Sequence, residues 1–175
     1  MSLLPVTRIQ TARFLMRSLV EADATDGYRA WFSDPEIRRH IQYAREKVTL
    51  PGLRKYIADR ATRDDVLFLG IFDHHTGIHI GNVKFEPIDQ RRSLAVLGVL
   101  IGAREWRNRG VAQETIPPAC AWVRAHHGVS RFLLGVARDN RPAAAAYERI
   151  GFRTTNDFPD IVHGSTALTM VWEPT

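Results

Sequence analysis

The chain has 175 residues, of which 45% are hydrophobic and 25% charged, and these proportions are typical of one globular domain over residues 1–175. No apolar run approaches the roughly 18 residues of a membrane-spanning helix. The N-terminus lacks the apolar core of a signal peptide, so we expect a cytoplasmic protein. The single cysteine, Cys120, excludes an internal disulfide.

The formal net charge of +5 is compatible with an anionic partner. The arginines are scattered from Arg8 to Arg153, whereas nucleic-acid binding requires a clustered basic surface, so we do not expect it. His75 and His79 are four residues apart, but Thr76 and Gly77 between them break a helix, so no metal site is expected. A homodimer remains open.

The first third of the chain predicts a strand followed by helices. Residues 12–19 alternate loosely between apolar and polar and predict the strand. Residues 20–34 begin with acidic side chains, as helix starts do. Ser33 or Asp34 before Pro35 predicts the N-cap of a helix that continues to residue 43. Residues 51–63 predict another helix.

The pattern then changes to that of a sheet. Residues 66–73 and 78–87 predict a hairpin, with a possible bulge at Gly81 and Asn82. Residues 94–101 are apolar without alternation, so both faces of this strand should be covered. Gly98 inside it indicates a bulge or a close backbone approach.

The second half of the chain predicts a parallel βαβ unit. A helix over residues 111–126 joins the strand 94–101 to a second buried strand, 131–137. Pro117 and Pro118 should kink this helix or shorten its regular part. An alanine-rich helix follows and ends at Gly151, and the segments 151–155 and 165–173 are predicted to be closing strands.

The loop from Gly102 to Val111 should lie beyond the carboxyl end of a parallel strand, where ligands bind. The following helix begins near Gly110, and its unpaired N–H groups suit a phosphate. Gly110 allows close approach or positive φ, and Arg107 and Arg109 supply positive charge. The loop is therefore interpreted as a pyrophosphate cradle, with a solvated turn as the alternative.

Two motifs resemble those of the GNAT superfamily of acyl-CoA-dependent N-acetyltransferases. The sequence RNRGVA is similar to the family's Arg/Gln-x-x-Gly-x-Gly/Ala signature, whose backbone N–H groups hold the CoA pyrophosphate. The matching residues are Arg107, Asn108, Arg109, Gly110, Val111 and Ala112. The sequence DNRPAAAAYERIGF resembles the later family motif, through Asn140, Tyr147, Gly151 and Phe152. Residues 11–41 are similar to the branch of the ribosomal-protein alanine N-acetyltransferases.

This resemblance implies an α/β fold with a mixed, mostly antiparallel sheet, a central parallel βαβ unit and flanking helices. It also implies transfer of an acetyl group from acetyl-CoA, without a metal, to a primary amine of a protein N-terminus, a small amine or an amino sugar. The alternative is a non-catalytic module that binds or senses acyl-CoA.

The resemblance also assigns roles to single residues. The backbone of Leu100, Ile101 and Gly102 should pair with the pantetheine arm, and one N–H there should polarise the acetyl carbonyl. Tyr147 is the candidate acid for the CoA thiolate, because a phenol is protonated at neutral pH. A structural tyrosine is the alternative. Asn140 should position the CoA arm, and it can also cap the helix that follows.

The general base is where the sequence departs from the family. Many relatives carry a glutamate on the strand that is SLAVLGVLIG here, but the nearest position is Val96 and the segment holds no acid. Glu86 is the best-placed carboxylate. Asp89, His79 and Glu105 are weaker candidates, and a water chain is another. For each of these four side chains, a surface charge is the favoured interpretation.

Overall fold

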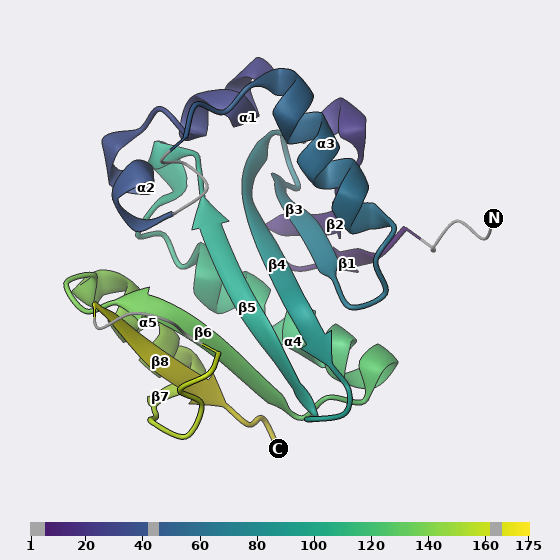
Figure 1. The fold of residues 1–175 in the computed structure, drawn as a ribbon. Coiled ribbons are helices and arrows are strands. Elements are labelled where there is room, and N and C mark those ends of the chain that lie inside the picture. Colours follow the sequence, from purple (N-terminus) through teal and green to yellow (C-terminus); the bar gives the residue numbers. More distant parts are fainter. Residues whose placement is uncertain (1–5, 42–45, 162–165) are drawn as a thin grey trace.

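The computed structural model describes residues 6–41, 46–161 and 166–175. Its centre is an eight-stranded sheet with the order β1-β2-β3-β4-β5-β6-β8-β7 (Figure 1). In chain order the strands are β1 (Arg8–Gln10), β2 (Phe14–Ser18), β3 (Leu67–Asp73), β4 (His79–Asp89), β5 (Leu94–Ile101), β6 (Arg131–Ala137), β7 (Arg153–Thr154) and β8 (Ala167–Trp172). The start of the predicted last strand, at Ser165, lies outside the described residues.

The strand directions confirm the expected sheet. All neighbouring strands are antiparallel except β5 and β6, which are parallel and are joined by the helix α4 (Val111–His127). The hairpin of β3 and β4 is confirmed, and its bulge lies at Ile80, next to the predicted Gly81.

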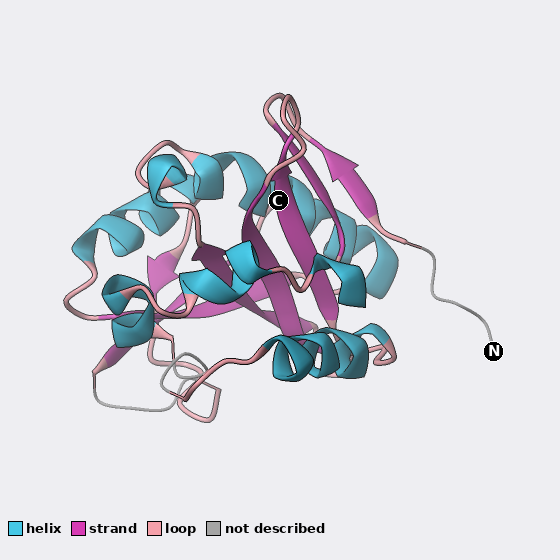
Figure 2. Cartoon of the chain, turned by 90° about the horizontal axis from the view of Figure 1, so that it is seen from above, coloured by secondary structure: helices cyan, strands magenta, loops and turns pink. Residues whose placement is uncertain are grey.

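Helices lie on both sides of the sheet (Figure 2). Besides α4 they are α1 (Asp26–Trp31), α2 (Pro35–His40), α3 (Leu50–Ala61) and α5 (Arg141–Ile150), with short 3-10 turns η1 (Glu21–Asp23) and η3 (Arg104–Trp106). Asp34 caps α2 by accepting a hydrogen bond from the N–H of Glu36, with Pro35 in the first turn, as the sequence predicts. Among the described residues, none of these helices has the length and apolarity needed to cross a bilayer.

Two buried clusters hold the layers together. One packs α4 and α5 against the sheet and includes Phe85, Ile116 and Phe132. The other packs α1, α2 and α3 against the opposite face and includes Tyr28 and Leu53. Cys120 is fully buried in the first cluster.

Two features differ from what the sequence predicts. The helix α4 is not shortened, since it runs without interruption through Pro117 and Pro118, whereas a kink at these prolines stays a prediction. The carbonyl groups that these prolines leave without a helical partner belong to Gln113 and Glu114, which are half-buried. Gly98 forms neither a bulge nor a close approach, because it pairs regularly with β4 and a Cβ there would meet no atom within 4 Å.

Candidate active site

The site begins where the two parallel strands separate. β5 and β6 pair only from Leu94 opposite Arg131 to Val96 opposite Leu133, although β5 continues to Ile101 and β6 to Ala137. Figure 1 shows the two strands diverging beyond this short paired segment. Beyond the paired segment, the edges of β5 and β6 that face each other therefore carry backbone N–H and C=O groups without a hydrogen bond to a neighbouring strand.

The register identifies the backbone groups on the β5 edge. Gly102 donates its N–H to the carbonyl of Ile80 at 3.0 Å, which turns Gly102 toward β4. Backbone groups alternate in direction along an antiparallel strand, so Leu100 also faces β4, while Val99 and Ile101 face the gap. The backbone that a ligand in the gap can pair with is thus that of Val99 and the N–H of Ile101, whose carbonyl accepts a hydrogen bond from Arg107.

A cavity of about 510 Å³ occupies this gap. Its walls come from β5, β6, α2, α5 and the start of α4. Most of the sequence-predicted cofactor residues line it, and they are Leu100, Ile101, Arg107, Asn108, Gly110, Val111, Ala112, Asn140 and Tyr147. The structure also adds residues that no motif marked, among them Val99, Gln113 and Arg149.

The start of α4 fits an anionic group. Gly110 is the N-cap residue with φ 74°, and no side chain caps the helix. The first intrahelical bond runs from the N–H of Glu114 to the carbonyl of Gly110, so the N–H groups of Val111, Ala112 and Gln113 have no partner within the helix. These donors line the cavity and carry the partial positive charge of a helix N-terminus.

Arg107 differs from the expectation that it supplies charge to a ligand. Its guanidinium donates to the carbonyls of Ile101 and Gly102, both at 3.0 Å. It also pairs with Asp34 at 3.0 Å and Glu36 at 2.8 Å. The Arg107 side chain therefore fastens the loop to the end of β5 and to α2.

Arg109 and Gly102 do not line the cavity, and their predicted contact with the cofactor stays a prediction. The side chain of Arg109 is exposed, and its carbonyl accepts a hydrogen bond from Arg13 at 3.0 Å. Gly102 faces α1, where a Cβ would overlap the ring of Trp31 at 1.9 Å. Gly102 thus lets β5 and α1 approach, and the helix terminus supplies the positive character of the loop.

Tyr147 and Asn140 lie on α5, across the gap from β5. The side chain of Asn140 accepts a hydrogen bond from the N–H of Ala143 at 3.4 Å, so its role as an N-cap is confirmed. Tyr147 lies seven residues further along the chain and also lines the cavity. Burial of its side chain raises the pKa of Tyr147 to about 12. The phenol is therefore protonated at neutral pH.

A second cavity of about 330 Å³ meets the first at Tyr147. It lies toward α1 and α3, and the two cavities share the wall formed by Val99, Leu100 and Gly135. Sequence analysis missed most of its lining, which includes Tyr28, Tyr56, Phe68, Lys84 and Gly98. The only sequence signal was Gly98, a glycine inside an otherwise apolar strand.

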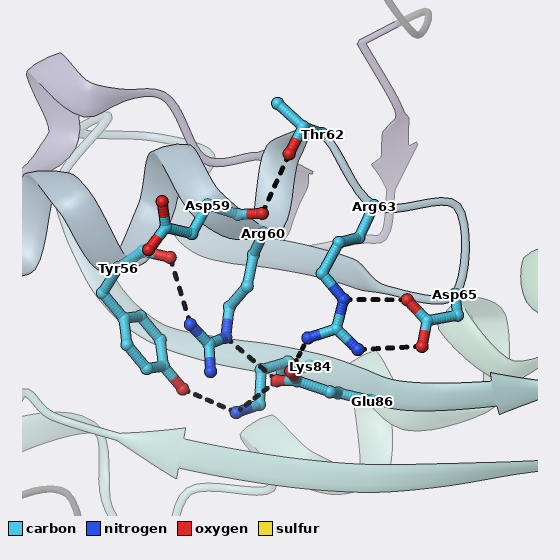
Figure 3. Close-up of polar contacts among 8 residues, drawn as sticks. All are labelled: Tyr56, Asp59, Arg60, Thr62, Arg63, Asp65, Lys84 and Glu86. Carbon is cyan, nitrogen blue, oxygen red and sulfur yellow. Dashed lines mark hydrogen bonds and ion pairs between the residues drawn. The ribbon is translucent and has the colours of Figure 1, made fainter.

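The carboxylate of Glu86 is paired with three cations (Figure 3). Glu86 lines neither of the two cavities. Its carboxylate contacts Arg60 at 2.9 Å, Arg63 at 2.6 Å and Lys84 at 3.0 Å. Burial alone would raise the pKa of Glu86, but the hydrogen bond to Lys84 and the nearby positive charges outweigh it, and the pKa is lowered. This arrangement does not favour Glu86 as the base, because its carboxylate is paired with three cations and lies outside both cavities.

The weaker candidates are no better placed. Asp89, His79 and Glu105 line neither of the two cavities. His79 instead lines a separate depression beside α1, and its Nε2 lies 2.8 Å from the side-chain oxygen of Asn82. Among the described residues, no carboxylate lines the second cavity.

The comparisons with known proteins agree with this geometry. The sequence model of the family described as "Acetyltransferase (GNAT) domain" matches residues 13–153 of this chain. The chain therefore belongs to the GNAT acetyltransferase family, and it is an acetyl-CoA-dependent N-acetyltransferase. No curated protein matches the chain by sequence.

Solved structures share the fold at low sequence identity. RimL, a ribosomal L7/L12 α-N-protein acetyltransferase in complex with CoA, has a TM-score of 0.81 at 12% identity and covers 95% of this chain and 98% of its own. MccE, a microcin C7 self-immunity acetyltransferase in complex with acetyl-CoA and AMP, has a TM-score of 0.80 at 16% identity and covers 99% of both chains. Spermidine N-acetyltransferase from Vibrio cholerae has a TM-score of 0.76 at 18% identity, covering 93% and 96%.

Proposed function

We propose that the chain acetylates the primary amine of a small molecule, with acetyl-CoA in the first cavity and the acceptor in the second. The observation that carries this proposal is the meeting of the two cavities at Tyr147, beside the unpaired edge of β5. A volume of about 330 Å³ suits a small acceptor. A protein N-terminus is the second candidate, favoured by the likeness to RimL.

The first cavity offers donors in the places that the cofactor needs. The N–H groups of Val111, Ala112 and Gln113 are to hold the pyrophosphate, with Gly110 permitting close approach. The edge of β5 at Val99 and Ile101 is to hold the pantetheine arm, and Asn140 lies across the gap. Acetyl-CoA, when bound, supplies the thioester that the amine attacks.

Tyr147 is proposed to donate a hydrogen bond to the departing sulfur. A phenol with a pKa of about 12 is a weaker acid than a thiol, whose pKa is ordinarily about 8.5. Complete proton transfer from Tyr147 to the thiolate is therefore unfavourable, whereas a hydrogen bond to the developing charge is favourable. Its role is thus electrostatic, which refines the expected role as an acid.

The amine must lose its proton, and we propose that water accepts it, because no carboxylate among the described residues lines the second cavity. The rate should rise with pH in either case. Glu86→Gln should leave kcat within about threefold of the parent and the pH profiles superimposable, as expected for a residue outside the proton path. If the low-pH part of the pH–rate profile of Glu86→Gln differs from that of the parent, Glu86 is the base.

Release of free CoA thiol, measured with a panel of amines, tests the proposal as a whole. Acetylation of at least one small amine, confirmed by mass spectrometry of the product, is the expected result. Tight acetyl-CoA binding without thiol release from any small amine or peptide would instead identify a sensing module.

Gly98→Leu tests the division of the site into two cavities. Gly98 lines only the second cavity, and its Cβ position is empty, so the larger side chain should be accommodated without backbone strain. We expect KM for the acceptor to rise about tenfold or more, because the added bulk occupies its place. The affinity for CoA, measured by calorimetry, should not change, and a parallel loss of CoA binding would contradict the division.

A further inference from the structure

The floor of the second cavity is a row of residues that lie side by side on adjacent strands. Phe68 on β3 pairs with Lys84 on β4, and Lys84 pairs with Gly98 on β5. Residues directly opposite each other in an antiparallel sheet project to the same face. Because Gly98 has no side chain and nothing fills its Cβ position, the row leaves open space beside Lys84.

The Lys84 ammonium group has a donor to spare. It donates to the hydroxyl of Tyr56 at 2.7 Å and pairs with Glu86 at 3.0 Å (Figure 3). An ammonium has three N–H donors, and these two partners use two of them. The side chain is 28% exposed and lines the second cavity, so the remaining donor is available to a molecule in that cavity.

The charge around Lys84 is not fully neutralised. Glu86 is shared among Lys84, Arg60 and Arg63. Arg63 also pairs with Asp65 at 2.8 Å, so three cations face two carboxylates. Since no carboxylate among the described residues lines the second cavity, its electrostatic character is positive at Lys84.

We infer that the acceptor amine carries an anionic oxygen group, a carboxylate or a phosphate, that binds Lys84; this inference rests on the proposed function. A charge-assisted hydrogen bond from Lys84 would fix that end of the acceptor. The aromatic walls formed by Tyr28, Phe32 and Phe68 cover its apolar body. A polycation such as spermidine meets like charge at Lys84 and has no carboxylate to pair with.

The spacing of the strands sets the distance between Lys84 and the first cavity. Lys84 and Gly98 form a hydrogen-bonded pair, whose Cα atoms lie about 5.5 Å apart. Leu100, at the wall shared with the first cavity, is two residues further along β5, roughly 7 Å away. The Cα atoms of Lys84 and Leu100 are therefore roughly 9 Å apart, a distance that the Lys84 side chain and a small acceptor span together.

Matched pairs of amines, in which only one member carries an anionic group, test the inference. The probes are L-phenylalanine against L-phenylalaninamide, and O-phosphoethanolamine against ethanolamine, with spermidine and a peptide with a free N-terminus as further acceptors. We expect kcat/KM of the parent to favour the anionic member of at least one pair by about tenfold or more, the range of one hydrogen bond between charged groups. Which pair responds distinguishes a carboxylate from a phosphate.

Lys84→Met should abolish that preference while leaving CoA affinity, measured by calorimetry, unchanged, and Lys84→Arg should largely retain it. Lys84→Met leaves Glu86 paired with both arginines, so the fold should persist, and circular dichroism checks this. A preference that survives Lys84→Met, or faster acetylation of the neutral member, the peptide or spermidine, overturns the inference but leaves the transferase intact. If the parent binds acetyl-CoA but acetylates no probe at all, the proposed function fails with it.

Discussion

Tyr147→Phe should lower kcat by about one to three orders of magnitude, the range for loss of a group that acts on the leaving atom. The variant keeps the aromatic ring, which packs against Phe152 with ring centroids 6.0 Å apart, and removes only the hydroxyl. The departing thiolate then lacks the hydrogen bond that we propose for it. KM for acetyl-CoA and its affinity measured by calorimetry should change little, because binding depends mainly on the start of α4.

The measurement that isolates this step is a single-turnover rate with a true amine substrate, since product release can hide a change in chemistry. An unchanged single-turnover rate would remove Tyr147 from the mechanism. A loss of CoA affinity as large as the loss of rate would show instead that Tyr147 only shapes the cavity wall.

Gly110→Val should weaken CoA binding on the order of a hundredfold, since each hydrogen bond to a charged group contributes about 1.5–3 kcal/mol. Gly110 has φ 74°, and a β-branched residue in this left-handed region costs roughly 1–2 kcal/mol. The first turn of α4 must then shift, and the new side chain stands where the phosphate is to approach. Calorimetry with CoA measures the effect.

The other end of the same helix provides a matched control. Gly128 is the C-cap of α4, has φ 69° and has no atom within 4 Å of its Cβ position. Gly128→Val thus introduces the same backbone strain far from the first cavity, and the two variants should lose similar stability. Equal CoA affinities in the two variants would contradict the cradle, because only Gly110 borders the cavity.

The parts of the site that could be predicted from sequence are those encoded locally. An unbroken apolar strand, a loop with Gly110 and a helix with one apolar stripe define β5, α4 and β6 without reference to the rest of the chain. The N-cap at Asn140 is local in the same sense. Gly110 was placed correctly because a backbone requirement restricts the residue type more strongly than a side-chain contact does.

The errors arose where distant residues decide the role of a side chain. Arg107 appeared free for a ligand, but Asp34 and Glu36, about seventy positions earlier in the chain, bind its guanidinium. Glu86 appeared to be a free carboxylate, but Arg60 on α3 and Arg63 just after this helix both pair with it. The hydrophobic periodicity of the sequence does not predict such ion pairs, because they depend on how α2 and α3 pack on the sheet.

The separation of β5 from β6 gives this protein two sheet edges inside the molecule. Exposed edges normally attract the strands of other chains, and proteins protect them with charges, bulges or short strands. Here α2, α4 and α5 surround the edges, so a folded neighbour cannot reach them, whereas a thin, extended molecule with amide groups can. The same enclosure that we propose as the place of the pantetheine arm therefore also guards the chain against edge-to-edge aggregation.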